Sequence, residues 1–342
     1  MTFPLERYTI FLTLAGSQAH GTARDGSDVD LRGVCVAPLS VRLSLFATFE
    51  QYEGSLPDAF GASVLPRIKA HPTASRALDV KTECVVFDIA KFVALCAAAN
   101  PNALEILFAD ERDWVLETPG WRRLHDERRQ FLTKKVQQTF LGYAMAQLKK
   151  IETHRSWLLN PPAKKPSRED FGLPVAGGTL SRDDHNRIEQ SIADIDAHLR
   201  AVAAQALSLP PEVVAALNAE KKYRAALKRW DSYQTWKSQR NPARAELERV
   251  HGYDTKHAMH LIRLMRMGLE VLETGDLRVR RDDADELSAI RDGAMSFDEL
   301  LAAATGLQES MARAATTTTL PDDVDRERVD ALAISLISDA SA

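Results

Sequence analysis

Two short groups of residues near the beginning of the chain have the types and spacing needed to bind metal ions and a phosphate chain. Gly16-Ser17 ends one apolar run, and ten residues later Asp28-Val29-Asp30 opens another. Side chains alternate across a strand, so Asp28 and Asp30 project from the same face and can share bound cations, whereas Val29 points into the core. These residues suit the transfer of a nucleotide from a nucleoside triphosphate.

The glycine of the first group allows the backbone to come close to a bound phosphate. A Gly-Ser turn at the end of a strand brings N–H groups and the Ser17 hydroxyl near phosphate oxygens, which a residue bulkier than Gly16 would hold away. Asp-x-Asp and Gly-Ser are each common in surface turns, so either group alone indicates little. Their combination on successive apolar runs, joined by a polar linker, predicts a clamp for metal and triphosphate.

At these residues the sequence resembles the nucleotidyltransferase superfamily typified by DNA polymerase beta. The motif of that superfamily is a hydrophobic residue followed by Gly-Gly or Gly-Ser, a linker, and then Asp-hydrophobic-Asp/Glu. More narrowly, residues 16–34 resemble a bacterial and phage family of nucleotidyltransferases, some of them associated with RNA repair. Residues 91–105 and 252–261 resemble the same family. The resemblance implies a polymerase-beta-like catalytic sheet and nucleotide transfer.

A site with two cations on a triphosphate needs a third carboxylate. One ion must contact the attacking nucleophile while the other neutralises the leaving pyrophosphate. Asp79 and Glu83 lie four residues apart on a strand predicted over residues 77–87 and share one of its faces. The resemblance favours Glu83, because its distance from Lys91-Phe92 corresponds to the acidic position of the family, where Asp is more usual. Asp79 is the alternative, and either acid could instead be a solvated strand residue.

A helix predicted over residues 253–273 carries basic side chains opposite its apolar face. Lys256, His260 and Arg263 lie about one turn apart on this face, with few acids near them in sequence. A solvated face usually mixes both signs of charge, so we expect Lys256 and His260 to reach the triphosphate across an interdomain cleft. His257 lies at the flank of the helix, where histidine is more often a packing residue than a ligand.

A second basic stretch is interleaved with aromatic residues. Its members are Lys221, Lys222, Tyr223, Arg224, Lys228, Arg229, Trp230, Tyr233, Trp236, Lys237 and Arg240. Such a mixture can bind nucleic acid through phosphate contacts and base stacking. The spacing of Tyr223, Leu227 and Trp230 is equally compatible with aromatic side chains in a core and basic side chains in solvent.

The order of the predicted elements indicates an α+β protein, with a polymerase-beta-like nucleotidyltransferase sheet and its helices followed by a large α-helical domain. We place the catalytic domain at residues 1–112 and the helical domain at residues 113–342. The helices of the second domain are predicted at about 132–158, 182–207, 211–240, 253–273 and 296–316. A Pro/Lys-rich segment at about 160–180 is predicted to be a linker or, alternatively, a basic loop over the active site.

Two shorter segments complete this prediction. Residues 50–76 contain several Gly, Pro and Ser residues with weak periodicity and are predicted to form a loop. Asp88 is predicted to cap a helix that ends before Asn100-Pro101.

The composition excludes several classes of protein. The 44 basic and 48 acidic residues leave the chain mildly acidic, so any contact with nucleic acid must be local. Cys35, Cys84 and Cys96 lie in apolar stretches without Cys-x-x-Cys spacing, which predicts buried thiols. The first residues do not resemble a signal peptide, and the chain lacks an apolar stretch of about eighteen residues. We therefore expect a cytoplasmic protein without membrane contact.

Together these observations predict a metal-dependent nucleotidyltransferase that uses a nucleoside triphosphate, with ATP as the first candidate, and releases pyrophosphate. The expected ligands of two Mg²⁺ ions, for which Mn²⁺ can substitute, are Asp28, Asp30 and Glu83. The expected nucleotide contacts are Gly16, Ser17, Arg32, Lys256 and His260, although Arg32 is equally compatible with a structural ion pair. RNA is the favoured acceptor, in end repair or tailing. The alternatives are AMP transfer to a protein or small molecule, and a non-catalytic nucleotide or RNA sensor.

Overall fold

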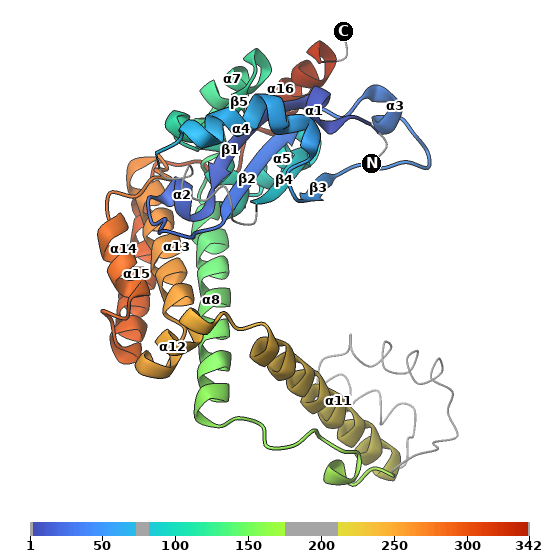
Figure 1. Cartoon of the computed structure of the whole chain (residues 1–342), viewed down its shortest axis with the longest axis vertical. Helices are drawn as coiled ribbons and strands as arrows, with labels where there is room; N and C mark the ends of the chain where they lie inside the picture. The colour runs from blue at the N-terminus through green and yellow to red at the C-terminus, as the bar shows by residue number, and fades with distance from the viewer. Residues whose placement is uncertain (1–2, 73–81, 175–210, 341–342) are drawn as a thin grey trace. The chain divides into compact units, whose positions relative to one another are not determined.

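The computed structural model describes residues 3–72, 82–174 and 211–340 (Figure 1). The chain divides into two compact units. Unit 1 comprises Met1–His154 and Leu247–Ala342, and unit 2 comprises Arg155–Glu246. The predicted domain boundary at residue 112 therefore falls inside unit 1, because the C-terminal segment packs in the same unit as the N-terminal sheet.

Unit 1 contains a five-stranded mixed sheet in the order β3-β4-β2-β1-β5. The strands are β1 Thr9–Ala15, β2 Val29–Cys35, β3 Gln51–Gly54, β4 Thr82–Asp88 and β5 Trp114–Glu117. The pairing of β2 is antiparallel with β1 and parallel with β4, and the remaining pairs are antiparallel. With helices around and after this sheet, the predicted α+β class is confirmed. The position of β5 shows that the sheet continues beyond residue 112.

Helices make up most of the rest of unit 1. The helices nearest the strands in sequence are α1 Leu5–Tyr8, α2 Gly16–His20, α3 Leu39–Arg42, α4 Gly61–Ala70, α5 Ile89–Ala97, α6 Pro101–Leu107 and α7 Pro119–Asp126. Those of the C-terminal segment are α13 Thr255–Thr274, α14 Ala284–Arg291, α15 Phe297–Thr317 and α16 Arg326–Asp339. In Figure 1, α13 lies beside α14 and α15, and it packs against both.

Unit 2 is mainly helical in the part that the structure describes. It contains the short 3-10 helix η5 Glu169–Phe171 and the long α11 Pro211–Ser238. Two further helices, α8 Lys135–Leu159 and α12 Pro242–His251, cross from one unit to the other. Of the predicted helices, α8, α11, α13 and α15 lie close to the predicted ranges, whereas the helix predicted at about 182–207 lies outside the described residues.

The segment from residue 50 to residue 72 is not the loop that its composition predicts. It contains β3, the 3-10 helix η1 Asp58–Phe60 and α4. Phe60, Val64 and Ile68 are fully buried in a core that also contains strand residues. These residues are spaced by four, so they lie on one face of the helix. The Gly, Pro and Ser residues around this face obscured its helical pattern.

A hydrophobic core lies on each face of the sheet. Leu31 of β2 joins Phe60 in the smaller core, and Val34 joins residues of α5, α8, α13 and α15 in the larger one. Since side chains alternate along a strand, Asp30 and Arg32 lie on the same face as Val34. The sheet therefore presents these two polar side chains on the face to which α13 packs.

Several local predictions agree with the structure. The Asp88 carboxylate accepts a hydrogen bond from the backbone N–H of Ala90 and caps α5. All three cysteines are buried and free, as predicted, and burial raises the pKa of the Cys84 thiol to about 12. Among the described residues, no helix is both long and apolar enough to cross a membrane.

Candidate active site

Three acidic side chains meet at the beginning of β2 and β4. Asp28 directly precedes β2, Asp30 is the second residue of that strand, and Glu83 is the second residue of β4. Asp30 and Glu83 are direct partners in the parallel register, so their side chains leave adjacent strands on the same face. Asp30 is half-buried, whereas Asp28 and Glu83 are exposed. Asp79, the alternative third carboxylate, lies outside the described residues.

The electrostatic environment of Asp30 is that of a crowded carboxylate group. Burial raises the pKa of Asp30, and the negative charges of Glu83 and Asp28 add to this effect, which Arg32 and Lys256 oppose. The Nη2 atom of Arg32 lies 3.6 Å from Oδ1 of Asp30. Carboxylates that repel one another and remain open to solvent are suitable oxygen ligands for a hard divalent cation.

Gly16 directly contacts this acidic group. It begins α2 with a φ of +60°, and a Cβ atom at this position would lie 2.5 Å from Oδ2 of Asp30. The predicted Gly-Ser turn is thus the first turn of a short helix. Both the left-handed backbone and the close approach require glycine here, because any side chain would displace the Asp30 carboxylate.

Replacing Gly16 by Ala is expected to reduce nucleotide transfer at least about tenfold and to destabilise the fold by roughly 1–3 kcal/mol from backbone strain. Gly26→Ala is a matched control, since Gly26 also has a positive φ of +78° but has open space around its Cβ position. Both variants should lose similar stability in urea unfolding, while the rate of transfer falls only in Gly16→Ala. Equal transfer rates in the two variants would show that nucleotide transfer does not depend on the close approach of Gly16 to Asp30.

A buried ionic network lies beside the site and joins α2, α6 and α13. Nε2 of His20 is 3.0 Å from Oε2 of Glu105, and the Arg263 guanidinium donates to Oε1 of the same carboxylate. The side chains of His20 and Arg263 are almost completely buried. The helical wheel placed Arg263 on a basic stripe opposite the apolar face, but its side chain is buried and neutralises the Glu105 carboxylate inside the core.

Lys256 and His260 lie in the same unit as the three acids, so they need not reach across an interdomain cleft. Lys256 is exposed, and its charge lowers the pKa of Asp30. Burial, together with the charges of Arg263 and other neighbours, lowers the pKa of His260 to about 2. This shift favours the neutral imidazole near pH 7, so the predicted contact of His260 with the triphosphate would be a hydrogen bond and not a charge.

A pocket of about 710 Å³ opens next to the acids. Its lining includes Arg32, Glu83 and residues 53–58. Its volume lies within the range of small-molecule binding sites. The segment that the composition predicted to be a loop thus forms a wall of a pocket that includes two candidate site residues.

The connection between Gly16 and Asp28 is held by the C-terminal segment. The Arg24 guanidinium donates to both carboxylate oxygens of Asp292, at 2.6 and 2.8 Å, and also to the carbonyl of Ser288. The backbone N–H of Arg281 donates to the carbonyl of His20 at 3.2 Å. Residues after α13 therefore help to position the polar linker at two points, His20 and Arg24.

The aromatic side chains of α11 pack against one another in unit 2. Tyr233 is buried, with Trp157 at 5.8 Å and Trp236 at 5.9 Å between ring centroids. The Arg240 guanidinium lies over the Trp236 ring at 4.3 Å. This arrangement is that of a small aromatic core, while the exposed basic residues of the helix are Lys221, Lys222, Lys228, Arg229 and Lys237.

Two groups were missed by the sequence reasoning. Glu105 and His20 form the buried network with Arg263, and His154 lies close to Asp254 and His257. The helix predicted over residues 253–273 in fact begins after Asp254, and an Asp so close to the beginning of a predicted helix was a local signal for a cap. No local pattern indicated His154, because a single histidine on a long helix resembles an ordinary surface residue.

A glycine at the end of one strand lies against carboxylates from two adjacent strands, which is the arrangement expected from the resemblance to the DNA polymerase beta superfamily. Residues 6–160, a little less than half of the chain, match the model of the RNA repair pathway DNA polymerase beta family, RlaP. The matched region contains Gly16, Asp28, Asp30 and Glu83, so it supports a nucleotidyltransferase role. No curated protein and no solved structure matches the chain.

Proposed function

We propose that the protein transfers a nucleoside monophosphate from a nucleoside triphosphate, ATP in the first instance, to a hydroxyl group of RNA and releases pyrophosphate. The observation that carries this proposal is the meeting of Asp28, Asp30 and Glu83 on one face of two paired strands, with Gly16 held against Asp30. The match of residues 6–160 to a polymerase-beta-like family supports the same reaction class.

The donor atoms of the acidic group fit magnesium. Three carboxylates supply the hard oxygen ligands that Mg²⁺ prefers, and Mn²⁺ accepts the same set. We assign Asp28, Asp30 and Glu83 as the ligands. When bound, two such ions would lower the pKa of the attacking hydroxyl and neutralise charge on the pyrophosphate.

The other residues around the acids act on the nucleotide. Gly16 leaves room for phosphate oxygens beside Asp30, and the hydroxyl of Ser17, the next residue, can donate to them. Arg32 and Lys256 supply positive charge near the leaving group. His260, being neutral, can contribute a hydrogen bond but no charge.

The reaction is an in-line displacement at the α-phosphorus. A bond forms between the acceptor oxygen and phosphorus, the bond to the bridging oxygen of pyrophosphate breaks, and the hydroxyl proton is released. The contribution of the protein is alignment and charge neutralisation, as in other phosphoryl transfers.

The choice of RNA as acceptor has two supports. The family is described by its place in an RNA repair pathway. In addition, α11 exposes several basic side chains that can contact phosphates, although its aromatic residues are engaged in packing. AMP transfer to a protein or a small molecule is the second candidate, and the 710 Å³ pocket beside Glu83 is large enough for a small acceptor.

The test is incubation of the purified protein with labelled ATP, GTP, CTP or UTP and Mg²⁺, with RNA, protein and small-molecule pools offered separately. We expect label in the RNA pool with wild type and none with Asp28→Ala. Label in another pool would identify a different acceptor. Binding of nucleotide without transfer would indicate a sensor. The absence of both binding and transfer would exclude the proposal.

Lys256→Ala is expected to raise the KM for the nucleotide about tenfold, which corresponds to about 1.4 kcal/mol of lost interaction with phosphate. The measurement is the initial rate of transfer over a range of nucleotide concentrations. Lys149→Ala is a suitable control, because Lys149 is an exposed lysine on the helix α8. Unchanged KM and kcat in Lys256→Ala would remove this residue from the proposed site.

A further inference from the structure

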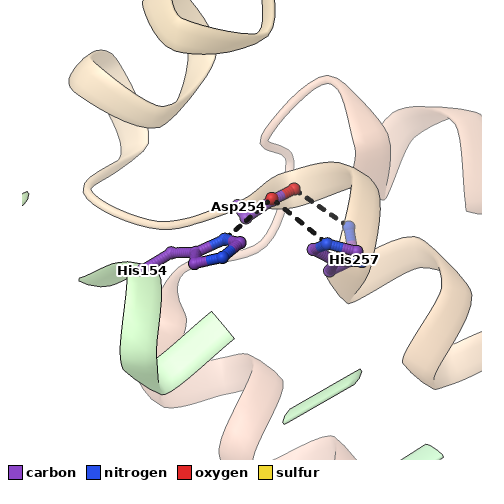
Figure 2. Close-up of side chains that lie close together, drawn as sticks. All are labelled: His154, Asp254 and His257. Atoms are coloured by element: carbon purple, nitrogen blue, oxygen red, sulfur yellow. Dashed lines mark hydrogen bonds and ion pairs between the residues drawn. The ribbon is translucent and has the colours of Figure 1, made fainter. Parts of the chain in front are cut away.

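Three side chains with metal-binding atoms meet where α8 passes the beginning of α13. His154 lies on α8, Asp254 is the N-cap of α13, and His257 is the third residue of that helix. Figure 2 shows the Asp254 carboxylate between the two imidazole rings. All three residues belong to unit 1, and one ligand atom from each lies within 4.8 Å of the others.

The distances between these atoms are close to those around a bound ion. Nδ1 of His154 and Nε2 of His257 lie 3.5 and 3.6 Å from the same oxygen, Oδ2 of Asp254. In a tetrahedral zinc site with bonds of about 2.0–2.1 Å, ligand atoms lie roughly 3.3 Å apart. The separations also exceed the usual length of an N–H···O hydrogen bond, about 2.9 Å. A small inward shift of each side chain would complete the coordination.

Burial and charge favour a cation at this position. Asp254 has an exposed fraction of 0%, and the side chains of His154 and His257 are 18% and 17% exposed. A buried carboxylate is costly unless a positive charge compensates it. Oδ1 of Asp254 accepts the backbone N–H of His257 at 3.1 Å, which orients the carboxylate so that Oδ2 lies between the histidines.

We propose that His154, Asp254 and His257 bind one divalent transition-metal ion, for which Zn²⁺ is the best match, and that the ion ties α8 to the first turn of α13. Two imidazole nitrogens and one carboxylate oxygen form a typical zinc ligand set with a fourth position left open. This donor set differs from the all-oxygen group of Asp28, Asp30 and Glu83. The bound ion would also hold Lys256, which lies between two of its ligands in sequence, beside the acidic group.

The experiment uses the full chain, free of any tag and stripped of metal, titrated with Zn²⁺ by calorimetry. Bound metal after dialysis is measured by elemental analysis. We expect one tightly bound ion per chain. The affinity for Zn²⁺ should be at least about 100-fold lower in His154→Gln and His257→Gln, because mutation of residues that only support the metal ligands already lowers metal affinity about 10–100-fold. His251→Gln is the matched control, because His251 lies three residues before Asp254 but outside the group, and should bind as wild type.

Two further measurements separate this site from folding defects and from the acidic group. Zn²⁺ should raise the Tm of wild type and of Asp28→Asn but not that of the two histidine variants, whose far-UV circular dichroism should match wild type. A large excess of Mg²⁺ should leave Zn²⁺ bound. Absence of stoichiometric binding by wild type, equal affinity in the histidine variants, or loss of binding in Asp28→Asn would overturn the proposal.

Discussion

Asp30→Asn is expected to reduce nucleotide transfer by about a thousand-fold while leaving the fold intact or slightly more stable. Loss of one metal-binding carboxylate removes several kcal/mol of transition-state stabilisation, and about 4 kcal/mol corresponds to a thousand-fold in rate. In the metal-free protein the charge of Asp30 is unfavourable, because burial and the adjacent acids raise the pKa of this carboxyl. A neutral amide removes that cost. Activity and stability should therefore change in opposite directions.

The measurements are the initial rate of label transfer with Mg²⁺ and urea unfolding without it. Asp25→Asn is the matched control, because Asp25 is an exposed acid on the same linker and the substitution makes the same change in charge. It should transfer label at the wild-type rate. A variant Asp30→Asn that kept its activity, or that lost it only in proportion to a loss of folded protein, would contradict the assignment of the site.

Arg263→Met is expected to give the largest loss of stability, about 3–5 kcal/mol, because it removes the arginine that neutralises the Glu105 carboxylate in the protein interior and leaves His20 as its remaining partner in the network. Burial alone would raise the pKa of Glu105, but the charges of Arg263 and His20 and their hydrogen bonds hold it well below its ordinary value of 4.5. A second substitution, Glu105→Gln, should restore much of the loss, since it removes the uncompensated charge. Urea unfolding of both single variants and the double variant measures this coupling.

The pH dependence of the same network has a defined sign. The folded chain holds Glu105 ionised more strongly than the unfolded chain does, so the network contributes stability above about pH 4.5 and loses it as pH falls further. The stability gap between wild type and Arg263→Met should narrow in that acid range. Arg266→Met, one turn further along α13 and more exposed, should cost only about 1 kcal/mol. Equal losses in the two arginine variants would show that burial of the ion pair is not decisive.

Local sequence patterns were enough to predict the elements that carry the candidate site. Alternation around Val29 places Asp28 and Asp30 on one face, and the structure has β2 begin at Val29. The residues that cap and end helices are local signals as well, so α5 begins after Asp88 as predicted. Such features depend on a few neighbouring residues. They could therefore be predicted without knowledge of the rest of the chain.

The contacts between residues that are distant in sequence depend on how the elements pack in three dimensions. The parallel register places Glu83 beside Asp30, the docking of α13 buries Arg263 against Glu105, 158 positions away, and α8 brings His154 to Asp254. Burial likewise lowers the pKa of His260, although its place on the helical wheel indicated a cation. These pairings follow from the packing of the whole of unit 1. No short stretch of sequence contains both partners, so no local pattern could specify them.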